Sequence, residues 1–372
     1  MNEATRSFFD LLQVAVGARS DMGRVRSDDE WAEIYGIACR HKLEALTLSA
    51  LDRIPAEQLP SRRPMMRIYS DAQKIRLKNA RFNAELQVVA DHYAAAGFPG
   101  VILKGQGLAA LYDDPGVRTP GDIDIWLDGR TRDIIRFVKS ENPDVHELFC
   151  HHIDCQKFDG IEVEAHFYPS WMNSPFGNAR LKRWFRAQKP AQFANKVTLG
   201  GVVAEGDTEE RPGSTVAVPT PAFNRVYVLL HIYRHLFQEG IGLRQLLDYY
   251  YVLKQGFTEE ERAETLATLR RLKMRRFASA VMWVLGEVFA LERRYMLVEP
   301  SRKHGGFLLS EILSAGNFGQ YDARNAGLGS ASEGGKFFRK LRRLARFLGS
   351  YPSEVIWSPF FKIWHFFWRH TH

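Results

Sequence analysis

Two short stretches of alternating residues constrain the fold most, because each one places acidic side chains along a strand. In "DIDIWL", residues 122–127, aspartates alternate with isoleucines, and in "GIEVEAHF", residues 160–167, glutamates alternate with apolar residues. Successive side chains of a strand point to opposite faces, so the apolar ones can pack on a core while the acids share the other face. The sequence therefore predicts two strands that project carboxylates together.

The acidic faces of these strands predict a cation site. Asp122 and Asp124 share one face of the first strand, and Glu162, Glu164 and His166 share one face of the second. Neighbouring carboxylates repel each other and resist the loss of water, so a cation is expected between them. Hard divalent ions such as Mg²⁺ prefer oxygen ligands, and three carboxylates are typical of two-metal phosphoryl transfer. The alternative is a set of solvated acids at strand ends.

The chain divides into three regions by pattern. Residues 1–97 have apolar residues at helical spacing, whereas in residues 98–220 short β-rich runs alternate with helical ones. This alternation predicts an α+β fold with a small mixed sheet under helical cover. Residues 221–372 return to helix, with a Gly/Ser/Asn-rich connector at about 314–335. The spacing predicts helices at roughly 221–238, 242–255, 258–272 and 274–291.

A glycine turn precedes the first acidic strand. The run "LKGQGLAALY" places Lys104 at the end of a predicted strand, and Gly105 and Gly107 open the helix that follows. Free backbone N–H groups and a lysine at such a turn favour phosphate, although the Walker order of glycines and lysine is absent. Arg118 lies just before the aspartates and adds a donor for phosphate. The alternatives are that Lys104 only neutralises the acids and that Arg118 pairs with Asp113 or Asp114.

Composition narrows the classes of partner and compartment. The 372 residues are 45% hydrophobic and carry a net charge of +8, which favours an anionic partner such as nucleotide, nucleic acid or a membrane surface. Only three cysteines occur, which indicates a reducing compartment rather than a disulfide framework. We see no signal peptide and no run of apolar residues long enough to cross a bilayer, so we expect a cytoplasmic protein.

In this order, "VILKGQGLAALY", "RTPGDIDIWL" and "GIEVEAHFYPSW" resemble the bacterial uncharacterised nucleotidyltransferase family, which has the polymerase-β-like nucleotidyltransferase fold. The later run "VLLHIYRHLFQEGIGLRQLLDYYYVL" is similar to the helical half of that family, so the resemblance covers about residues 98–255. It implies a nucleotidyltransferase core over 98–220, with helical regions at 1–97 and 221–372. Gly-Gln-Gly stands where the wider superfamily has Gly-Ser.

The resemblance also implies a reaction and its residues. The reaction is the Mg²⁺- or Mn²⁺-dependent transfer of a nucleoside monophosphate from a nucleoside triphosphate to an acceptor. Asp122 and Asp124 would be metal ligands, and Glu164 would be a third ligand or the base toward the acceptor. Gly105 and Gly107 would belong to the phosphate turn, and His166 would contact phosphate or orient Glu164. Two other readings remain: an inactive binding protein of the same fold, and a basic protein that binds RNA or a membrane surface.

The helical half offers further polar candidates. His231 and His235 are spaced i, i+4 on a predicted helix, with Asp248 on the next, a spacing that can hold a metal. Helix packing is the alternative. Arg244 follows a Gly-Ile-Gly turn and could reach phosphate or pair with Asp248.

Three other stretches carry weaker signals. In "CHHIDC", residues 150–155, strand alternation would put Cys150, His152 and Asp154 on one face and His151 and Cys155 on the other, which disfavours a zinc site. A basic amphipathic stretch at 336–346 could bind an anionic partner or pack on the protein. The aromatic tail at 351–368 could dock on the helical region, cover a cleft or touch lipid, so the protein could be peripheral to a membrane.

Overall fold

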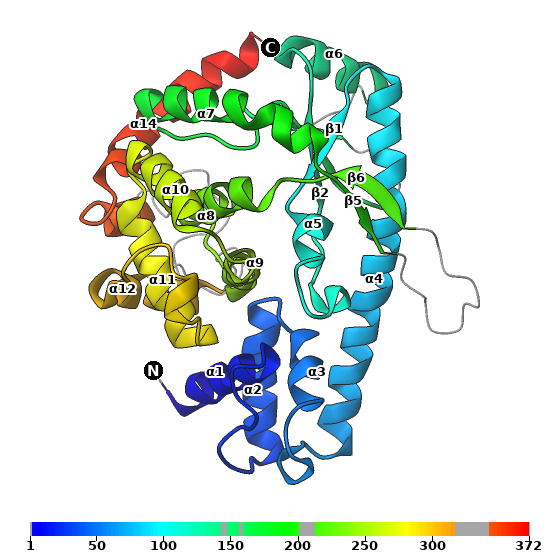
Figure 1. The fold of residues 1–372 in the computed structure, drawn as a ribbon, viewed down its shortest axis with the longest axis vertical. Coiled ribbons are helices and arrows are strands. Elements are labelled where there is room, and N and C mark those ends of the chain that lie inside the picture. Colours follow the sequence, from blue (N-terminus) through cyan, green and yellow to red (C-terminus); the bar gives the residue numbers. More distant parts are fainter. Residues whose placement is uncertain are drawn as a thin grey trace.

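The computed structural model describes residues 2–142, 147–155, 158, 160–200, 213–316 and 342–371. It is an α+β protein in which one six-stranded mixed sheet is surrounded by helices (Figure 1). The strands lie in the order β3-β4-β2-β1-β6-β5. Their bounds are β1 Gly100–Leu103, β2 Ile123–Leu127, β3 His152–Cys155, β4 Val163–His166, β5 Lys196–Leu199 and β6 Ser214–Ala217. The α+β expectation is confirmed.

Two strands at the centre of the sheet carry the acidic residues. β2 lies between β4, to which it is parallel, and β1, to which it is antiparallel. Every residue of β2 is buried, because both faces of the sheet are covered. The long helix α4 (Arg62–Ala95) runs along the sheet in Figure 1, and apolar side chains of α4 and α6 (Thr131–Glu141) fill one face. The other face meets α7 (Pro175–Ala194) and α8 (Pro221–Gln238), which share a core with Trp126 of β2.

Helices from both ends of the chain share that second core. The N-terminal helices α1 (Glu3–Ala15), α2 (Asp28–Arg40) and α3 (Leu46–Leu51) pack there with the helices that follow the sheet. Side-chain caps explain where several of these helices begin: Ser27 and Glu30 form a capping box at α2, and Thr258 and Glu261 form one at α10. The helices after α8 are α9 Leu243–Lys254, α10 Glu259–Arg271, α11 Arg275–Phe289 and α12 Arg302–Ala315.

The turn after β1 is the most unusual piece of backbone. Lys104 has a φ of 50° and Gly105 a φ of 41°, and α5 (Gly105–Ala109) follows directly. A lysine in this left-handed region is strained, at a cost of about 1–3 kcal/mol. Such strain persists where the surroundings hold it, and here the ion pair between the side chains of Lys104 and Asp124 does so.

Two helices differ from the sequence expectations. α7 was not anticipated, although Ser174 caps it and Pro175 stands at its first position. The aromatic tail forms the 19-residue helix α14 (Pro352–His370), which continues through Pro359. Of the basic stretch 336–346, residues 336–341 lie outside the described part, and residues 342–347 are helical. In that helical turn Leu344 is buried and Arg346 pairs with Glu311.

Candidate active site

The pairing of three strands brings the acidic residues together. Asp124 lies opposite Glu164 in the parallel pair of β2 and β4, and opposite Leu103 in the antiparallel pair of β1 and β2. Lys104, one residue beyond Leu103, therefore reaches the same place, and its Nζ lies 2.9 Å from Oδ2 of Asp124. Burial opposes the charge on Lys104, but the adjacent Asp124 outweighs it and raises the pKa of the lysine.

His166 joins the two carboxylates. Its Nε2 lies 2.8 Å from Oδ1 of Asp124 and 3.0 Å from Oε2 of Glu164. Burial disfavours the imidazolium, but these two hydrogen bonds outweigh burial and raise the pKa of His166 to about 9. For Glu164, burial is likewise outweighed by the bond from His166, and its pKa falls to about 2. The imidazolium and the ammonium of Lys104 thus compensate a buried pair of carboxylates.

Asp122 has a different position from Asp124. It precedes β2, whose first residue is Ile123, and it is only partly buried. It lines two adjacent cavities together with Lys104 and His231. Donor atoms of Asp124, Glu164 and His166 lie within 4.8 Å of one another, and within the described ranges no such metal-binding group contains Asp122. Asp122 stands at the junction between the cavities, and its negative charge acts on Glu164 and Lys104.

The smaller cavity, of about 60 Å³, is lined by charged residues from both halves of the chain. We call it the small pocket. The sequence candidates that line it are Lys104, Gly105, Arg118, Asp122, Asp124, His231, His235, Arg244 and Asp248. Gly107 does not line it: a Cβ there would lie 3.3 Å from Cγ1 of Val218, so this glycine permits close packing of α5.

Arg118 is held by an ion pair that the sequence did not indicate. Its Nε and Nη2 donate to the two carboxylate oxygens of Asp248 at 2.7 and 2.9 Å, and the Tyr112 hydroxyl donates to the same carboxylate at 2.7 Å. Nη1 of Arg118 is buried and has no hydrogen-bond partner among the described residues. One nitrogen of this guanidinium is therefore left to bind another group.

Two alternative pairings considered from the sequence are wrong. Arg118 does not pair with Asp113 or Asp114, because Arg53 and Arg76 occupy those acids. Asp248 is taken by Arg118 and not by Arg244.

Arg244 instead donates through Nη1 to the carbonyl of Thr119 at 2.6 Å, just before the acidic strand. Arg118 and Arg244 are thus both fixed at the wall of the small pocket.

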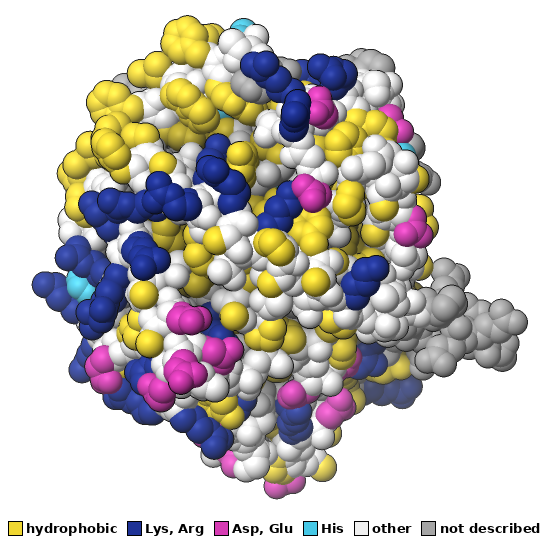
Figure 2. Space-filling model, turned by 45° about the horizontal axis from the view of Figure 1, so that its top comes forward, with side chains coloured by type: hydrophobic (Ala, Val, Ile, Leu, Met, Phe, Trp, Pro, Cys, Tyr) yellow, Lys and Arg dark blue, Asp and Glu magenta, His cyan; other side chains and the backbone are white. Residues whose placement is uncertain are grey.

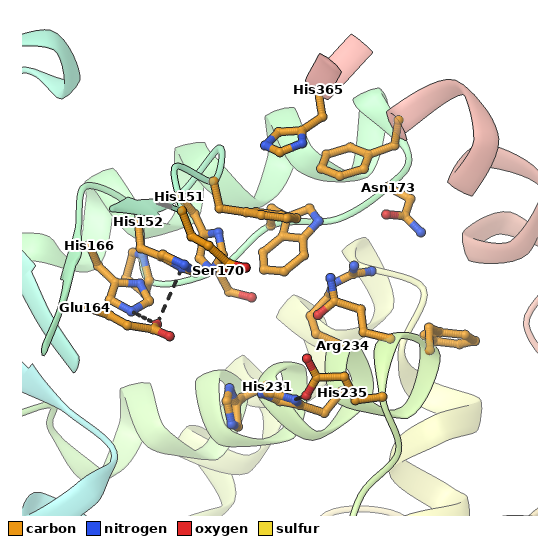
Figure 3. A pocket seen from close by; sticks show the side chains of 18 of the residues that line it. His151, His152, Glu164, His166, Ser170, Asn173, His231, Arg234, His235 and His365 are labelled. Carbon is orange, nitrogen blue, oxygen red and sulfur yellow. Dashed lines mark hydrogen bonds and ion pairs between the residues drawn. The ribbon is translucent and has the colours of Figure 1, made fainter. Parts of the chain in front are cut away.

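The larger cavity, of about 660 Å³, extends from Glu164 and Asp122 to α14. We call it the wide cavity. Figure 3 shows His231 and His235 of α8 on one side, His152 and His166 on another, and His365 of α14 across from them. Aromatic side chains complete its lining, namely Phe149, Trp171, Phe237, Phe361 and Phe366.

His231 connects the two cavities. Its Nδ1 lies 3.5 Å from Nζ of Lys104, and its ring centroid lies 4.2 Å from that of His235. Burial and the positive charge of Lys104 hold the pKa of His231 well below its ordinary value. The described residues contain no carboxylate or cysteine that would complete a metal site at these two histidines.

The expected alternation of "CHHIDC" is wrong at its start. β3 begins at His152, so residue 151 lies outside the strand, and both histidines line the wide cavity with ring centroids 4.3 Å apart. Nδ1 of His152 lies 3.4 Å from Oε2 of Glu164. Burial and the charge of Glu164 raise the pKa of Asp154 to about 7. Sequence analysis therefore missed His151, His152 and Asp154 as neighbours of the acidic pair.

Arg234 is a second residue that the sequence did not single out. Its guanidinium stacks over the ring of Trp171, and its Nη1 lies 2.9 Å from Oε2 of Glu354 in α14. Because all three side chains are buried, this contact fixes α14 against the wide cavity. The spacing of Arg234 within α8 gives no signal, since its partner lies 120 residues away.

One comparison with known proteins shows the family of this chain. The profile of a family described as "Uncharacterised nucleotidyltransferase" matches residues 27–290, which include β1, β2, β4 and α8. The chain belongs to this family. The match also includes the helices α2 to α4 that precede the sheet, so the family extends beyond the strands that carry the acids.

Other comparisons add little. No curated protein matches the chain. A crystal structure of an antigenic nucleotidyltransferase-like protein from Paracoccidioides brasiliensis is 15% identical to it and covers 60% of this chain and 95% of that one, with a TM-score of 0.30. Within the described ranges no helix is long and apolar enough to cross a membrane.

Proposed function

We propose that this family member transfers a nucleoside monophosphate from a nucleoside triphosphate to an acceptor and releases pyrophosphate. The observation that supports this most is the meeting of Asp124 and Glu164 on paired strands, beside Lys104, where a pocket lined by three cations and three acids opens into a wide cavity. Such a site can hold a charged polyphosphate on one side and a bulkier group on the other.

The donor set fits a divalent metal ion. Oxygens of Asp124 and Glu164 lie close enough to share an ion, and Asp122 lines the cavities beside them. Asp122, Asp124 and Glu164 would hold Mg²⁺ or Mn²⁺, which when bound polarises the transferred phosphoryl group and stabilises the charge that develops on it. Lys104 and His166 supply positive charge beside Asp124.

The small pocket suits the triphosphate tail of the nucleotide. Lys104 provides a point charge, and the unpartnered Nη1 of Arg118 provides a directed donor. Arg244 adds a third cation to the same wall. Because Arg118 and Arg244 are already fixed by protein contacts, little side-chain entropy is lost when they bind phosphate. The wide cavity, with its aromatic lining, would take the nucleoside and the acceptor.

The residues of this chain would also hold the carboxylates in place. Glu164 has a strongly lowered pKa, so it remains ionised, which suits a metal ligand better than a base. His166 donates to both Glu164 and Asp124 and therefore positions both carboxylates. It is the sole described side chain that bridges them.

Titration of nucleoside triphosphates in the presence of Mg²⁺ tests the proposal. Lys104→Met should weaken triphosphate binding by roughly 1.5–3 kcal/mol, the range for a hydrogen bond to a charged group. Lys74→Met is a matched control, because Lys74 is exposed and its partner is Asp71 on the same helix. Unchanged affinity in Lys104→Met, or no triphosphate binding by the native chain, would disprove the mechanism. Mass spectrometry of a reaction with labelled triphosphates and cell extract would then identify the acceptor.

A second candidate is a binding protein of the same fold without activity. The observation that favours it is the internal compensation of Asp124, whose two oxygens already contact Lys104 and His166. Such a protein would bind nucleotide without releasing pyrophosphate, so a nucleotide affinity without turnover in extract separates the two.

A further inference from the structure

Imidazole groups surround the carboxylate to which the proposed function assigns the metal. Oε2 of Glu164 lies 3.0 Å from Nε2 of His166 and 3.4 Å from Nδ1 of His152 (Figure 3). His151 adds a third ring, with its Nε2 3.1 Å from Nδ1 of His152. Donor atoms of the three histidines lie within 4.8 Å of one another, as do those of His152, Asp154 and Glu164. Spacings of this size suit ligands that share one ion.

The far nitrogens of two of these rings also have partners. Nδ1 of His166 lies 3.3 Å from the carbonyl oxygen of Tyr168, and Nε2 of His152 lies 3.5 Å from Oδ1 of Asp154. Metal-bound histidines commonly donate their other N–H to a carbonyl or carboxylate, which fixes the ring and directs the remaining lone pair at the ion. In both rings the nitrogen that faces Glu164 is the one that would bind the metal, in exchange for its present contacts with the neighbouring side chains.

We propose that His152 and His166 are metal ligands beside Glu164, so that the site prefers a transition ion such as Mn²⁺ or Co²⁺ to Mg²⁺. Imidazole nitrogen suits first-row transition ions, whereas Mg²⁺ is held by oxygen. This inference rests on the proposed function for the place of the metal but not for any turnover. Asp154 acts as a positioning residue through His152.

Spectroscopy of the bound ion tests this without any reaction. The full-length chain, stripped with a chelator and loaded with Mn²⁺, should show electron spin echo modulation from ¹⁴N of imidazole. His152→Gln and His166→Gln should each weaken that modulation, and Asp154→Asn should lower Mn²⁺ affinity about 10–100-fold. His92→Gln is the control, because His92 pairs with Glu141 away from the cavities.

The outcomes separate the two proposals. Bound Mn²⁺ without ¹⁴N modulation, or modulation that survives both histidine substitutions, would overturn imidazole ligation. Failure of the native chain to bind Mn²⁺ or Co²⁺ would overturn it as well. Clear ¹⁴N modulation in a protein that releases no pyrophosphate would support the ligand assignment and refute the nucleotidyl transfer.

A separate observation concerns the outer face of α14. One side of this helix lines the wide cavity, through Phe361 and His365 among others, whereas the other side is exposed. Figure 2 shows hydrophobic side chains gathered at the upper left, where α14 lies in Figure 1. Large apolar residues on the exposed side are Ile356 at 54%, Phe360 at 58%, Ile363 at 59%, Trp364 at 45% and Phe367 at 64% exposure. Their spacing places them along one stripe of the helix.

The charges near this stripe are of one sign. The one acid of α14, Glu354, is buried against Arg234, and Lys362 and Arg369 are exposed. α7 contains no acid. It meets α14 where the ring centroids of Phe176 and Trp357 lie 6.2 Å apart. Dark-blue cationic side chains border the apolar patch in Figure 2.

We infer that the outer stripe of α14 docks on an anionic lipid surface. A helix with Trp and Phe on one side and Lys and Arg at its flanks lies in the membrane interface without crossing it. That mode agrees with the absence of a spanning helix from the described ranges. The unbalanced positive charge favours anionic lipid over the same surface of a second copy, since like charges would then face each other.

Co-sedimentation of the full chain with vesicles tests the docking. Binding should be strong to phosphatidylcholine vesicles that contain phosphatidylglycerol and weak to phosphatidylcholine alone. Phe360→Ser with Phe367→Ser should reduce binding by at least about tenfold, because two half-exposed rings no longer enter the interface. Leu77→Ser with Val88→Ser, at 53% and 52% exposure on α4, should leave it unchanged. Equal binding by both double variants, or self-association that the α14 variant abolishes, would overturn the inference.

Discussion

The small pocket and the wide cavity meet at Asp122 but differ in the side chains that line them. In the small pocket, cations and acids are paired by short contacts, as in Arg118 with Asp248 and Lys104 with Asp124. Many histidines and aromatic rings line the wide cavity, whose volume is about 660 Å³ against about 60 Å³ for the small pocket. The small pocket presents fixed charged groups, whereas the wide cavity presents volume and aromatic surface.

The first way to break this comparison is to remove an acid from the small pocket. Asp248→Asn should lower the free energy of unfolding by about 3–5 kcal/mol, because it leaves the buried Arg118 without its countercharge. Denaturant unfolding measures this loss. Asp133→Asn is the control, since its partner Arg136 is exposed on the same helix and the pair should contribute less than about 1 kcal/mol. Equal stability of both variants would show that the small pocket is not held by its ion pairs.

The second test separates the roles of Glu164 and His166, two neighbouring groups that line the wide cavity. Glu164→Gln should lower turnover by a factor on the order of 10³, the equivalent of several kcal/mol of transition-state stabilisation. His166→Gln should lower it less, because glutamine can still donate to Asp124 or Glu164. Pyrophosphate release in extract measures both. Equal losses would mean that His166 itself takes part in the chemistry and does more than position the acids.

The sequence indicated the acidic strands better than the contacts between distant parts of the chain, for a physical reason. The acids of β2 and β4, and Lys104 after β1, follow from strand alternation and a glycine turn, which are local patterns. The pairing of Arg118 with Asp248 joins residues that are 130 positions apart, and no local pattern encodes it. His151 was misplaced because alternation was extended to residue 150, two residues before the start of β3.

The far wall of the wide cavity illustrates the same limit. α14 lies there because Glu354 reaches Arg234, and the helix continues through Pro359. Proline at the first turn of a helix costs little, which explains Pro352, whereas the continuation past Pro359 depends on tertiary packing.

A third test uses pH to compare the charges of the two cavities. The pKa of His231 is held well below its ordinary value, so between neutral pH and its folded pKa the unfolded chain binds a proton that the folded chain does not. Stability is therefore fully present above about pH 6.5 and falls as the pH is lowered, by up to ~1.4 kcal/mol per pH unit. His231→Gln should reduce this slope by about one proton, as measured by denaturant unfolding at several pH values. An unchanged slope would show that His231 is not kept neutral by its burial beside Lys104.

The smallest expected effect addresses the division of the ligand between the cavities. Phe361 lies on the cavity side of α14, and its ring stacks on Trp171 with centroids 6.2 Å apart. Phe361→Leu keeps the apolar volume but removes a ring, so nucleoside triphosphate binding should weaken by about 0.5–1.5 kcal/mol. Binding of inorganic tripolyphosphate should not change, because that ligand has no group for the wide cavity. Lys104→Met should give the reverse pattern, with both ligands weakened. Phe360→Leu is the matched control, since the adjacent ring points outward with 58% exposure. If Phe361→Leu weakens tripolyphosphate as much as the nucleotide, the two cavities act as one site and do not divide the ligand between charge and shape.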